Sequence, residues 1–143
     1  MPTLSSAIKA SGSALTAERT RIEVAVSNLA NAGSTRSADG QPYRRRDVIL
    51  TADNGSAFDR ALGSASATGV KVAAIVEDTS PFQEIYDPTH PDADKATGRV
   101  KVPNVKAEEE MVDLLQAARA YQANLAAVNV IRDMVAKALE LGK

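Results

Sequence analysis

The sequence predicts an α+β fold that is mainly helical, with a long helix at each end and a small β-rich segment between them. Proline is absent from residues 3–41 and 104–143, and glycine is absent from residues 13–32 and 99–141. Because these residue types interrupt helices, both ends of the chain are free to form one. We expect an N-terminal helix over residues 3–33, a β and loop segment over 34–104, and a C-terminal helix over 105–142.

A seven-residue apolar repeat marks the N-terminal helix. Its members are Ile8, Leu15, Ile22 and Leu29. This spacing is typical of a narrow apolar stripe along one face of a helix. Gly33 follows the last member, and we expect it to end the helix with a positive φ angle.

The C-terminal repeat is longer, and it alternates steps of three and four residues. Its members are Met111, Leu114, Ala118, Tyr121, Leu125, Val128, Arg132, Val135 and Leu139, of which only Arg132 is not apolar. We expect Asn104 or a neighbour to cap this helix, and Glu108–Glu110 to favour its positive N-terminus. At 1.5 Å per residue the helix is on the order of 50 Å long. So small a chain cannot bury such a helix alone.

Short runs in the middle segment read as strands. Residues Asp47–Thr51 and Gly69–Glu77 are the longer ones, and Gln83–Tyr86 and Arg99–Val102 are shorter. Residues 51–68 are rich in Ala, Ser, Gly, Asp and Asn, so we expect a mobile loop there.

The composition indicates a monomer with an incomplete core. The chain has 26 alanines but only two Phe, three Tyr and no Trp, and its net charge is −1. Low net charge favours a folded chain, whereas a chain with few large side chains cannot bury enough apolar surface to complete its core. Neighbouring subunits could supply the missing burial, which is typical of an assembly protein.

Several classes of function lack support in the sequence. Balanced charge argues against nucleic acid binding, and the absence of cysteine removes disulfides and thiolate metal sites. No apolar run reaches the length of a membrane span, and charged residues such as Lys9, Glu18 and Arg19 interrupt any secretory signal. These observations alone would indicate a cytoplasmic protein. No nucleotide-binding or acyl-transfer motif occurs, so we expect no enzyme, no cofactor and no small-molecule substrate.

The single histidine is a candidate metal ligand. His90 lies between prolines, and Asp87, Asp92 or Asp94 could complete a site. Their spacing matches no known ligand pattern, so we favour a proline-fixed turn with solvated acids and expect no metal. Consecutive helix positions face different directions, so Glu108–Glu110 are better explained by helix electrostatics than by catalysis.

Two further groups leave alternatives open. Arg44–Arg46 could contact a partner subunit, remain solvated, or less plausibly contact nucleic acid. Asn28, Asn31, Asn124 and Asn129 lie in helical patterns that Asn does not favour. They could pair across helices and fix the register between subunits, or they could simply be exposed, as we favour for Asn31.

Three motif blocks resemble the flagellar rod and hook family of axial proteins. Residues 10–34 (ASGSALTAERTRIEVAVSNLANAGS) resemble the N-terminal signature of the family, and residues 109–143 resemble its C-terminal signature. The middle segment, with its Asp-Pro-Thr-His-Pro turn, is similar to the proximal rod branch rather than to the much longer hook and distal rod proteins. Gly33, Ser34 and Thr35 depart from the Asn or Asp with Thr that usually follows the first signature.

The resemblance implies a structural rod subunit. Its terminal helices would pack as a coiled-coil-like axial domain, and its helical polymer would transmit motor torque for swimming. Its partners would be other copies, other rod subunits and the flagellar type III export apparatus. It would lie in the periplasmic rod of the basal body, exported without a cleaved signal peptide. The alternative is a coiled-coil adaptor or chaperone of the export system.

The residues that we expect to carry helix packing and assembly come from both terminal repeats and their asparagines. They are Ile8, Leu15, Ile22, Asn28, Leu29, Asn31, Met111, Leu114, Tyr121, Asn124, Leu125, Val128, Val135 and Leu139.

Overall fold

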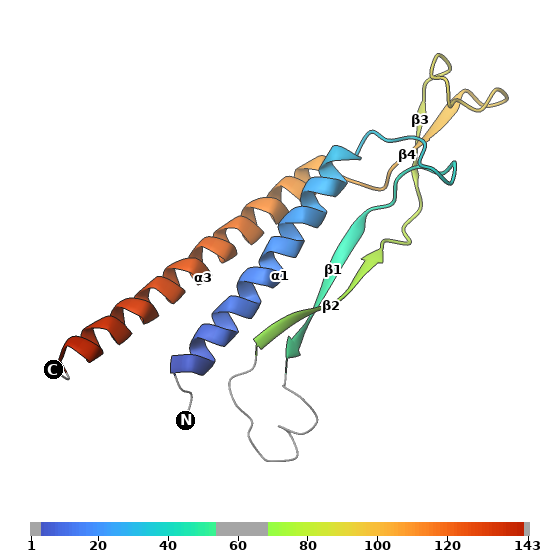
Figure 1. Ribbon diagram of the computed structural model, residues 1–143. Helices are drawn as coiled ribbons and strands as arrows, with labels where there is room; N and C mark the ends of the chain where they lie inside the picture. Colours follow the sequence, from blue (N-terminus) through green and yellow to red (C-terminus); the bar gives the residue numbers. More distant parts are fainter. Residues whose placement is uncertain (1–3, 54–68, 142–143) are drawn as a thin grey trace, which may run out of the picture.

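The computed structural model describes residues 4–53 and 69–141, and two long helices dominate it (Figure 1). Helix α1 spans Leu4–Ala30 and helix α3 spans Ala107–Leu141. They run antiparallel side by side, so the start of α1 and the end of α3 lie at one end of the molecule. The predicted α+β, mainly helical fold is confirmed. Neither helix contains a stretch apolar and long enough to cross a membrane.

Helix α1 ends through a side chain rather than through a glycine. The Asn31 backbone N–H donates to the Ser27 carbonyl over 3.1 Å, and its side-chain amide donates to the same oxygen over 2.8 Å. Ser34 N–H then donates to the Asn31 carbonyl in a following turn. Gly33 does not adopt a positive φ, which Gly40 and Gly98 do. The expectation for Gly33 was wrong because Asn31 already satisfies the last turn.

Helix α3 begins with three acidic residues, as expected. The first intrahelical bond runs from Glu110 N–H to the Lys106 carbonyl, and Glu108–Glu110 occupy the first turn. Asn104 does not cap this helix. Its side chain instead accepts a hydrogen bond from Arg45 N–H and donates one to the Asp78 carbonyl, at the ends of the first hairpin.

The buried stripe of α3 differs in phase from the predicted one. Buried and half-buried residues recur at alternating steps of four and three: Glu110, Leu114, Ala117, Tyr121, Asn124, Val128, Ile131 and Val135. Four of the nine members of the predicted repeat lie in this stripe, but Met111, Leu125 and Leu139 are exposed. The displacement arises because α1 approaches α3 over small and polar residues, such as the fully buried Ala117. A pattern of large apolar side chains does not include such residues.

Two antiparallel hairpins complete the structure. Strand β1 (Arg46–Asp53) pairs with β2 (Gly69–Glu77), with a register shift between Ile49 and Leu50. Strand β3 (Gln83–Tyr86) pairs with β4 (Arg99–Val102). All four predicted strands are present. Strand β1 extends beyond the predicted Thr51 to Ala52 and Asp53, which were expected in the loop, and the rest of that loop lies outside the described residues.

The hairpins occupy different places along the helix pair. The β1–β2 hairpin lies beside α1, and the β3–β4 hairpin projects beyond the end of the helix pair where α1 ends and α3 begins (Figure 1). Ser13 on α1 accepts a 3.0 Å hydrogen bond from Val70 N–H, which ties the first hairpin to the helix.

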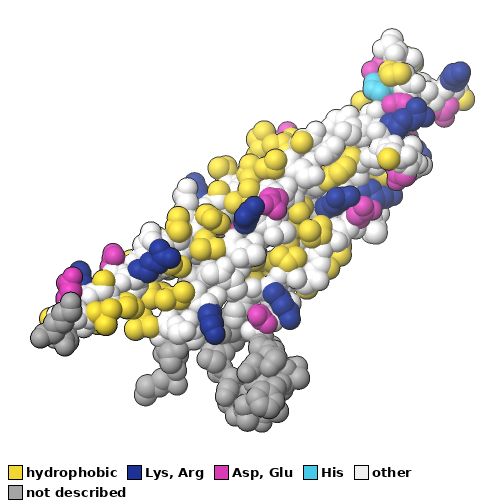
Figure 2. Space-filling model, in the orientation of Figure 1, with side chains coloured by type: hydrophobic (Ala, Val, Ile, Leu, Met, Phe, Trp, Pro, Cys, Tyr) yellow, Lys and Arg dark blue, Asp and Glu magenta, His cyan; other side chains and the backbone are white. Residues whose placement is uncertain are grey.

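The hydrophobic core is thin. Among the described residues its buried apolar members are Ala17, Ala25, Val100, Val105, Ala117 and Val128. Large apolar side chains remain exposed along both helices, and Leu139 retains 69% of its surface. Figure 2 shows hydrophobic side chains spread along the length of one face of the molecule.

A candidate assembly site at the junction of helices and hairpins

A buried amide lies where α1, α3 and β1 meet. Asn28 is 1% exposed, and its Nδ2 donates to Glu110 Oε2 over 2.9 Å and to the Arg46 carbonyl over 2.8 Å. Its Oδ1 accepts from Arg46 N–H and from the Tyr43 hydroxyl, both over 3.0 Å. The Asn28 amide therefore has four partners, the full capacity of its two donors and two principal acceptor positions.

Glu110 brings a buried carboxylate to the same point. Its Oε1 accepts a 2.6 Å bond from Arg45 Nε, while Oε2 accepts the bond from Asn28. Arg45 also lies 3.3 Å from Asp113 and 3.9 Å from Asp47. Partial burial alone would lower the pKa of Arg45, but the bond and charge of Glu110 outweigh it and raise that pKa above its ordinary value.

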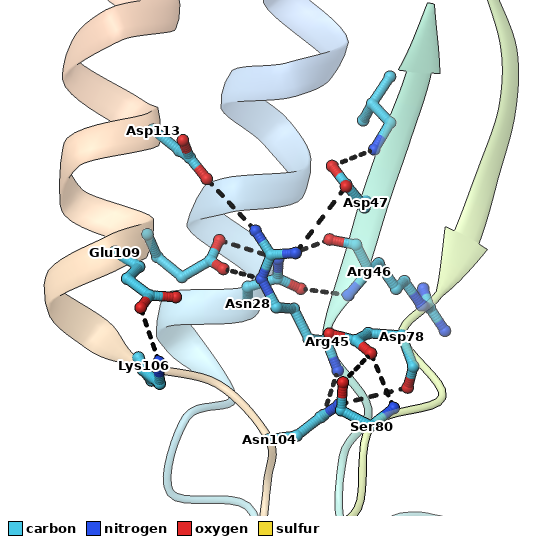
Figure 3. Close-up of polar contacts among 12 residues, drawn as sticks. Asn28, Arg45, Arg46, Asp47, Asp78, Ser80, Asn104, Lys106, Glu109 and Asp113 are labelled. Carbon is cyan, nitrogen blue, oxygen red and sulfur yellow. Dashed lines mark hydrogen bonds and ion pairs between the residues drawn. The ribbon is translucent and has the colours of Figure 1, made fainter.

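A second group of bonds adjoins this cluster. Asn104 Oδ1 accepts Arg45 N–H over 2.9 Å, and Asn104 Nδ2 donates to the Asp78 carbonyl over 3.2 Å. The Asp78 carboxylate accepts from the hydroxyl and backbone N–H of Ser80, which lowers the pKa of Asp78. The junction is thus a continuous polar network that joins three separate parts of the chain (Figure 3).

Ten of the fourteen predicted packing residues are buried or half-buried in the single chain. Asn28 and Val128 are buried, and the half-buried ones are Leu15, Ile22, Leu29, Asn31, Leu114, Tyr121, Asn124 and Val135. Ile8, Met111, Leu125 and Leu139 are exposed in the single chain. The role of all these residues in assembly stays a prediction.

The four asparagines behave differently from one another. Asn28 pairs across helices within one chain. Asn31 and Asn124 donate to backbone carbonyls of their own helices, those of Ser27 and Ala120. Asn129 is exposed.

The three arginines also divide. Arg45 is held by Glu110, whereas the Arg44 guanidinium lies 4.3 Å from the centre of the Phe82 ring. Arg46 is half exposed and lies 3.8 Å from Glu77. Each of the three arginines therefore has a contact within its own chain.

Sequence reasoning missed the central ion pair. Glu110 was grouped with its exposed neighbours Glu108 and Glu109, and Arg45 with Arg44 and Arg46. One signal was available, because three arginines stand together at the start of β1 and three acids stand together in the first turn of α3, and opposite charges of this kind can pair. Nothing in the local pattern distinguished the buried member of each triple.

The turn around His90 forms the far end of the second hairpin. His90 Nδ1 accepts Asp92 N–H over 3.1 Å, and the Asp87 carboxylate accepts from Thr89. No group of three potential metal ligands occurs within residues 4–53 and 69–141. An open groove of about 610 Å³ lies between this turn and residues 35–42, and its opposite charges pair internally, as in Arg36–Asp92 and Arg99–Glu84.

Known proteins resemble this chain over nearly its full length. The chain is 47% identical to the flagellar basal-body rod protein FlgC of Bacillus subtilis, covering 95% of the chain and 96% of that protein. It is 46% identical to the FlgC protein of Salmonella typhimurium (92% of each) and 39% identical to that of Borreliella burgdorferi (96% and 97%). The family described as flagellar basal body rod FlgEFG protein C-terminal matches residues 96–141, which include α3. This chain therefore belongs to the FlgC family of flagellar basal-body rod proteins.

Proposed function

We propose that the chain is a structural subunit of the proximal rod, which polymerises helically with other rod subunits and transmits motor torque. The relatives that match it along its whole length are flagellar basal-body rod proteins. The observation that carries the proposal is the exposed apolar surface of α3. Leu115, Leu125 and Leu139 retain 59%, 45% and 69% of their surface in the single chain. Apolar surface of this extent favours burial against further subunits.

The division of the chain fits such a subunit. We assign residues 3–33 and 105–142 to one axial domain and residues 34–104 to an outer segment. The antiparallel contact of α1 with α3, closed by the Asn28–Glu110 bond, supports one helical domain. The hairpins lie beside and beyond it (Figure 1).

The apolar repeat of α3 then packs against two partners, α1 of the same chain and a neighbouring subunit. Leu114, Tyr121, Val128 and Val135 face α1, whereas Met111, Leu125 and Leu139 are left for neighbouring subunits. One helix with two adjacent apolar stripes can pack against two partners at once. On this basis the predicted assembly residues divide into an internal and an external set.

Export through the flagellar type III apparatus, without signal cleavage, accords with the role of α1. Cleavage of α1 would remove Asn28, and Glu110 would lose a buried partner. The subunit would then lie in the periplasmic rod. The family is one of structural proteins, and we propose that the chain has no catalytic activity.

The adaptor alternative is not favoured by the family assignment. An electron-microscopy comparison of basal bodies from a deletion strain, with and without the tagged chain, tests the proposal. We expect incomplete rods without the chain, and complete rods containing the tag when it is restored. Complete rods that lack the tagged protein would overturn the structural role and favour an adaptor.

A further inference from the structure

The second hairpin projects from the body without a helix or strand to support it. We call residues 83–102 the tip hairpin. Among the described elements, neither β3 nor β4 packs against α1, α3, β1 or β2. Within the described residues, its direction relative to the helix pair is therefore set by segments that lie between the helices and strands. These are residues 31–45, 78–82 and 103–106.

Asn104 joins all three connections at one point. It lies between β4 and α3, its Oδ1 accepts Arg45 N–H over 2.9 Å, and its Nδ2 donates to the Asp78 carbonyl over 3.2 Å. Asp78 N–H in turn donates to the Arg45 carbonyl over 2.8 Å. A single side chain thus binds the start of β1 and the exit of β2, at the base of the tip hairpin (Figure 3).

Neighbouring contacts strengthen the same base. Arg44 donates to the Asp78 and Ser80 carbonyls over 3.2 and 3.4 Å, and its guanidinium covers Phe82 just before β3. Pro103, directly before Asn104, is fully buried. Further out, Thr35 donates to Asp92 over 2.9 Å, which holds the segment after α1 against the turn of the hairpin.

We propose that Asn104 is a positioning residue, which fixes the direction in which the tip hairpin projects from the helix pair. An amide suits this place because it must accept from one backbone and donate to another at the same time. Alanine does neither. Aspartate keeps the acceptor for Arg45 N–H but faces the Asp78 carbonyl with a second acceptor.

The consequence for assembly rests on the proposed function. A rod subunit whose tip hairpin changes direction would present Ile85 and Tyr86, which are exposed, at a wrong angle to its neighbours. The orientation itself can be measured on the isolated chain, so a failure of this inference is distinct from a failure of the rod assignment.

Pulsed electron–electron spin resonance can measure the orientation, because the chain has no cysteine of its own. Spin labels at Ala96→Cys and Ala123→Cys report the distance from the tip hairpin to α3. Labels at Ala30→Cys and Ala123→Cys report the distance between α1 and α3. All three alanines are exposed. The variants to compare are Asn104→Ala, Asn104→Asp and Arg44→Ala, with Asn129→Ala, at an exposed position of α3, as the matched control.

We expect narrow distance distributions for both pairs in the parent chain. Asn104→Ala should broaden the tip-to-helix distribution and leave the helix-pair distribution unchanged, Asn104→Asp should broaden it less, and Asn129→Ala should change neither. If Asn104→Ala does not fold, Arg44→Ala should still broaden the tip distribution alone. An unchanged tip distribution, equal broadening of both pairs, or a broad tip distribution in the parent would each overturn the inference.

Discussion

Asn28 donates a 2.9 Å hydrogen bond to Glu110 across 82 positions of sequence, and this bond joins the two long helices inside the molecule. Both side chains are 1% exposed. The contact lies near the end of α1 and the start of α3, so it fixes which residues of the two helices face one another. Small alanine side chains interlock little and so do little to fix the register of two helices. A buried polar contact can fix that register, because a shifted pairing would leave its polar groups without partners.

Glu110→Ala should destabilise the monomer strongly. The substitution leaves the Arg45 guanidinium without its closest carboxylate and Asn28 Nδ2 without one acceptor, and breaking such a pair from one side costs about 3 kcal/mol. Urea denaturation followed by circular dichroism measures the loss in free energy of unfolding. Glu109→Ala is the matched control, since Glu109 pairs with Lys106 at the exposed surface. Equal midpoints for the two variants would contradict the importance of the buried pair.

Gly69→Ala should destabilise the contact of the first hairpin with α1. A Cβ atom at residue 69 would lie 2.8 Å from Ser13 Oγ, which already accepts Val70 N–H. Relief of the clash would break that hydrogen bond. A double-mutant cycle with Ser13→Ala tests the cause, because the hydroxyl is then absent and Gly69→Ala should cost less. Strictly additive losses in the free energy of unfolding would show that the two residues are not coupled.

The sequence predicted most of the fold because its elements are local. The helices follow from breaker-free ends and a heptad spacing, and all four strands follow from short apolar runs between turn residues. The family resemblance of residues 10–34 and 109–143 is confirmed by relatives that cover the chain.

The junction could not be predicted because it is not local. Whether Glu108, Glu109 or Glu110 turns inward depends on where Asn28 and Arg45 lie in space. The large apolar side chains of α3 also predict a stripe that differs by one residue from the buried one at every second position. The close helix approach uses Ala117, a residue that carries little signal in a hydrophobic pattern.

Ser80→Ala should raise the pKa of Asp78 toward its ordinary value. The bonds from the Ser80 hydroxyl and backbone N–H favour the ionised carboxylate and hold its folded pKa below that of the unfolded chain. Their contribution to stability is therefore present above the unfolded pKa, about 3.9, and is lost as pH falls through the folded pKa. An NMR titration of the Asp78 carboxyl carbon measures the shift.

Thr89→Ala provides the control for this titration. The hydroxyl of Thr89 lowers the pKa of Asp87 in the same way, at the far turn of the tip hairpin. The Thr89 variant should raise the pKa of Asp87 and leave that of Asp78 unchanged. Similar shifts of both carboxyl groups in either variant would show a general loosening rather than the loss of one hydrogen bond.

Leu125→Asp should abolish rod completion while leaving the monomer intact. Leu125 lies in the middle of α3 and is 45% exposed, so the single chain loses little packing when a carboxylate replaces it. In the proposed assembly the same position is covered by a neighbouring subunit, where an unpaired carboxylate costs several kcal/mol. We therefore expect normal export on immunoblots, an unchanged urea midpoint for the purified chain, and no swimming in soft agar.

Leu114→Asp separates this effect from misfolding. Leu114 is half-buried in the stripe that faces α1, so its substitution should lower the urea midpoint of the monomer as well as motility. His90→Ala, which removes only a turn contact with Asp92, should remain motile. A motile Leu125→Asp strain, or a Leu125→Asp monomer as unstable as the Leu114→Asp monomer, would contradict the division of α3 into an internal and an external stripe. Because the two leucines share one helix and one residue type, the contrast between them depends on the direction each side chain faces.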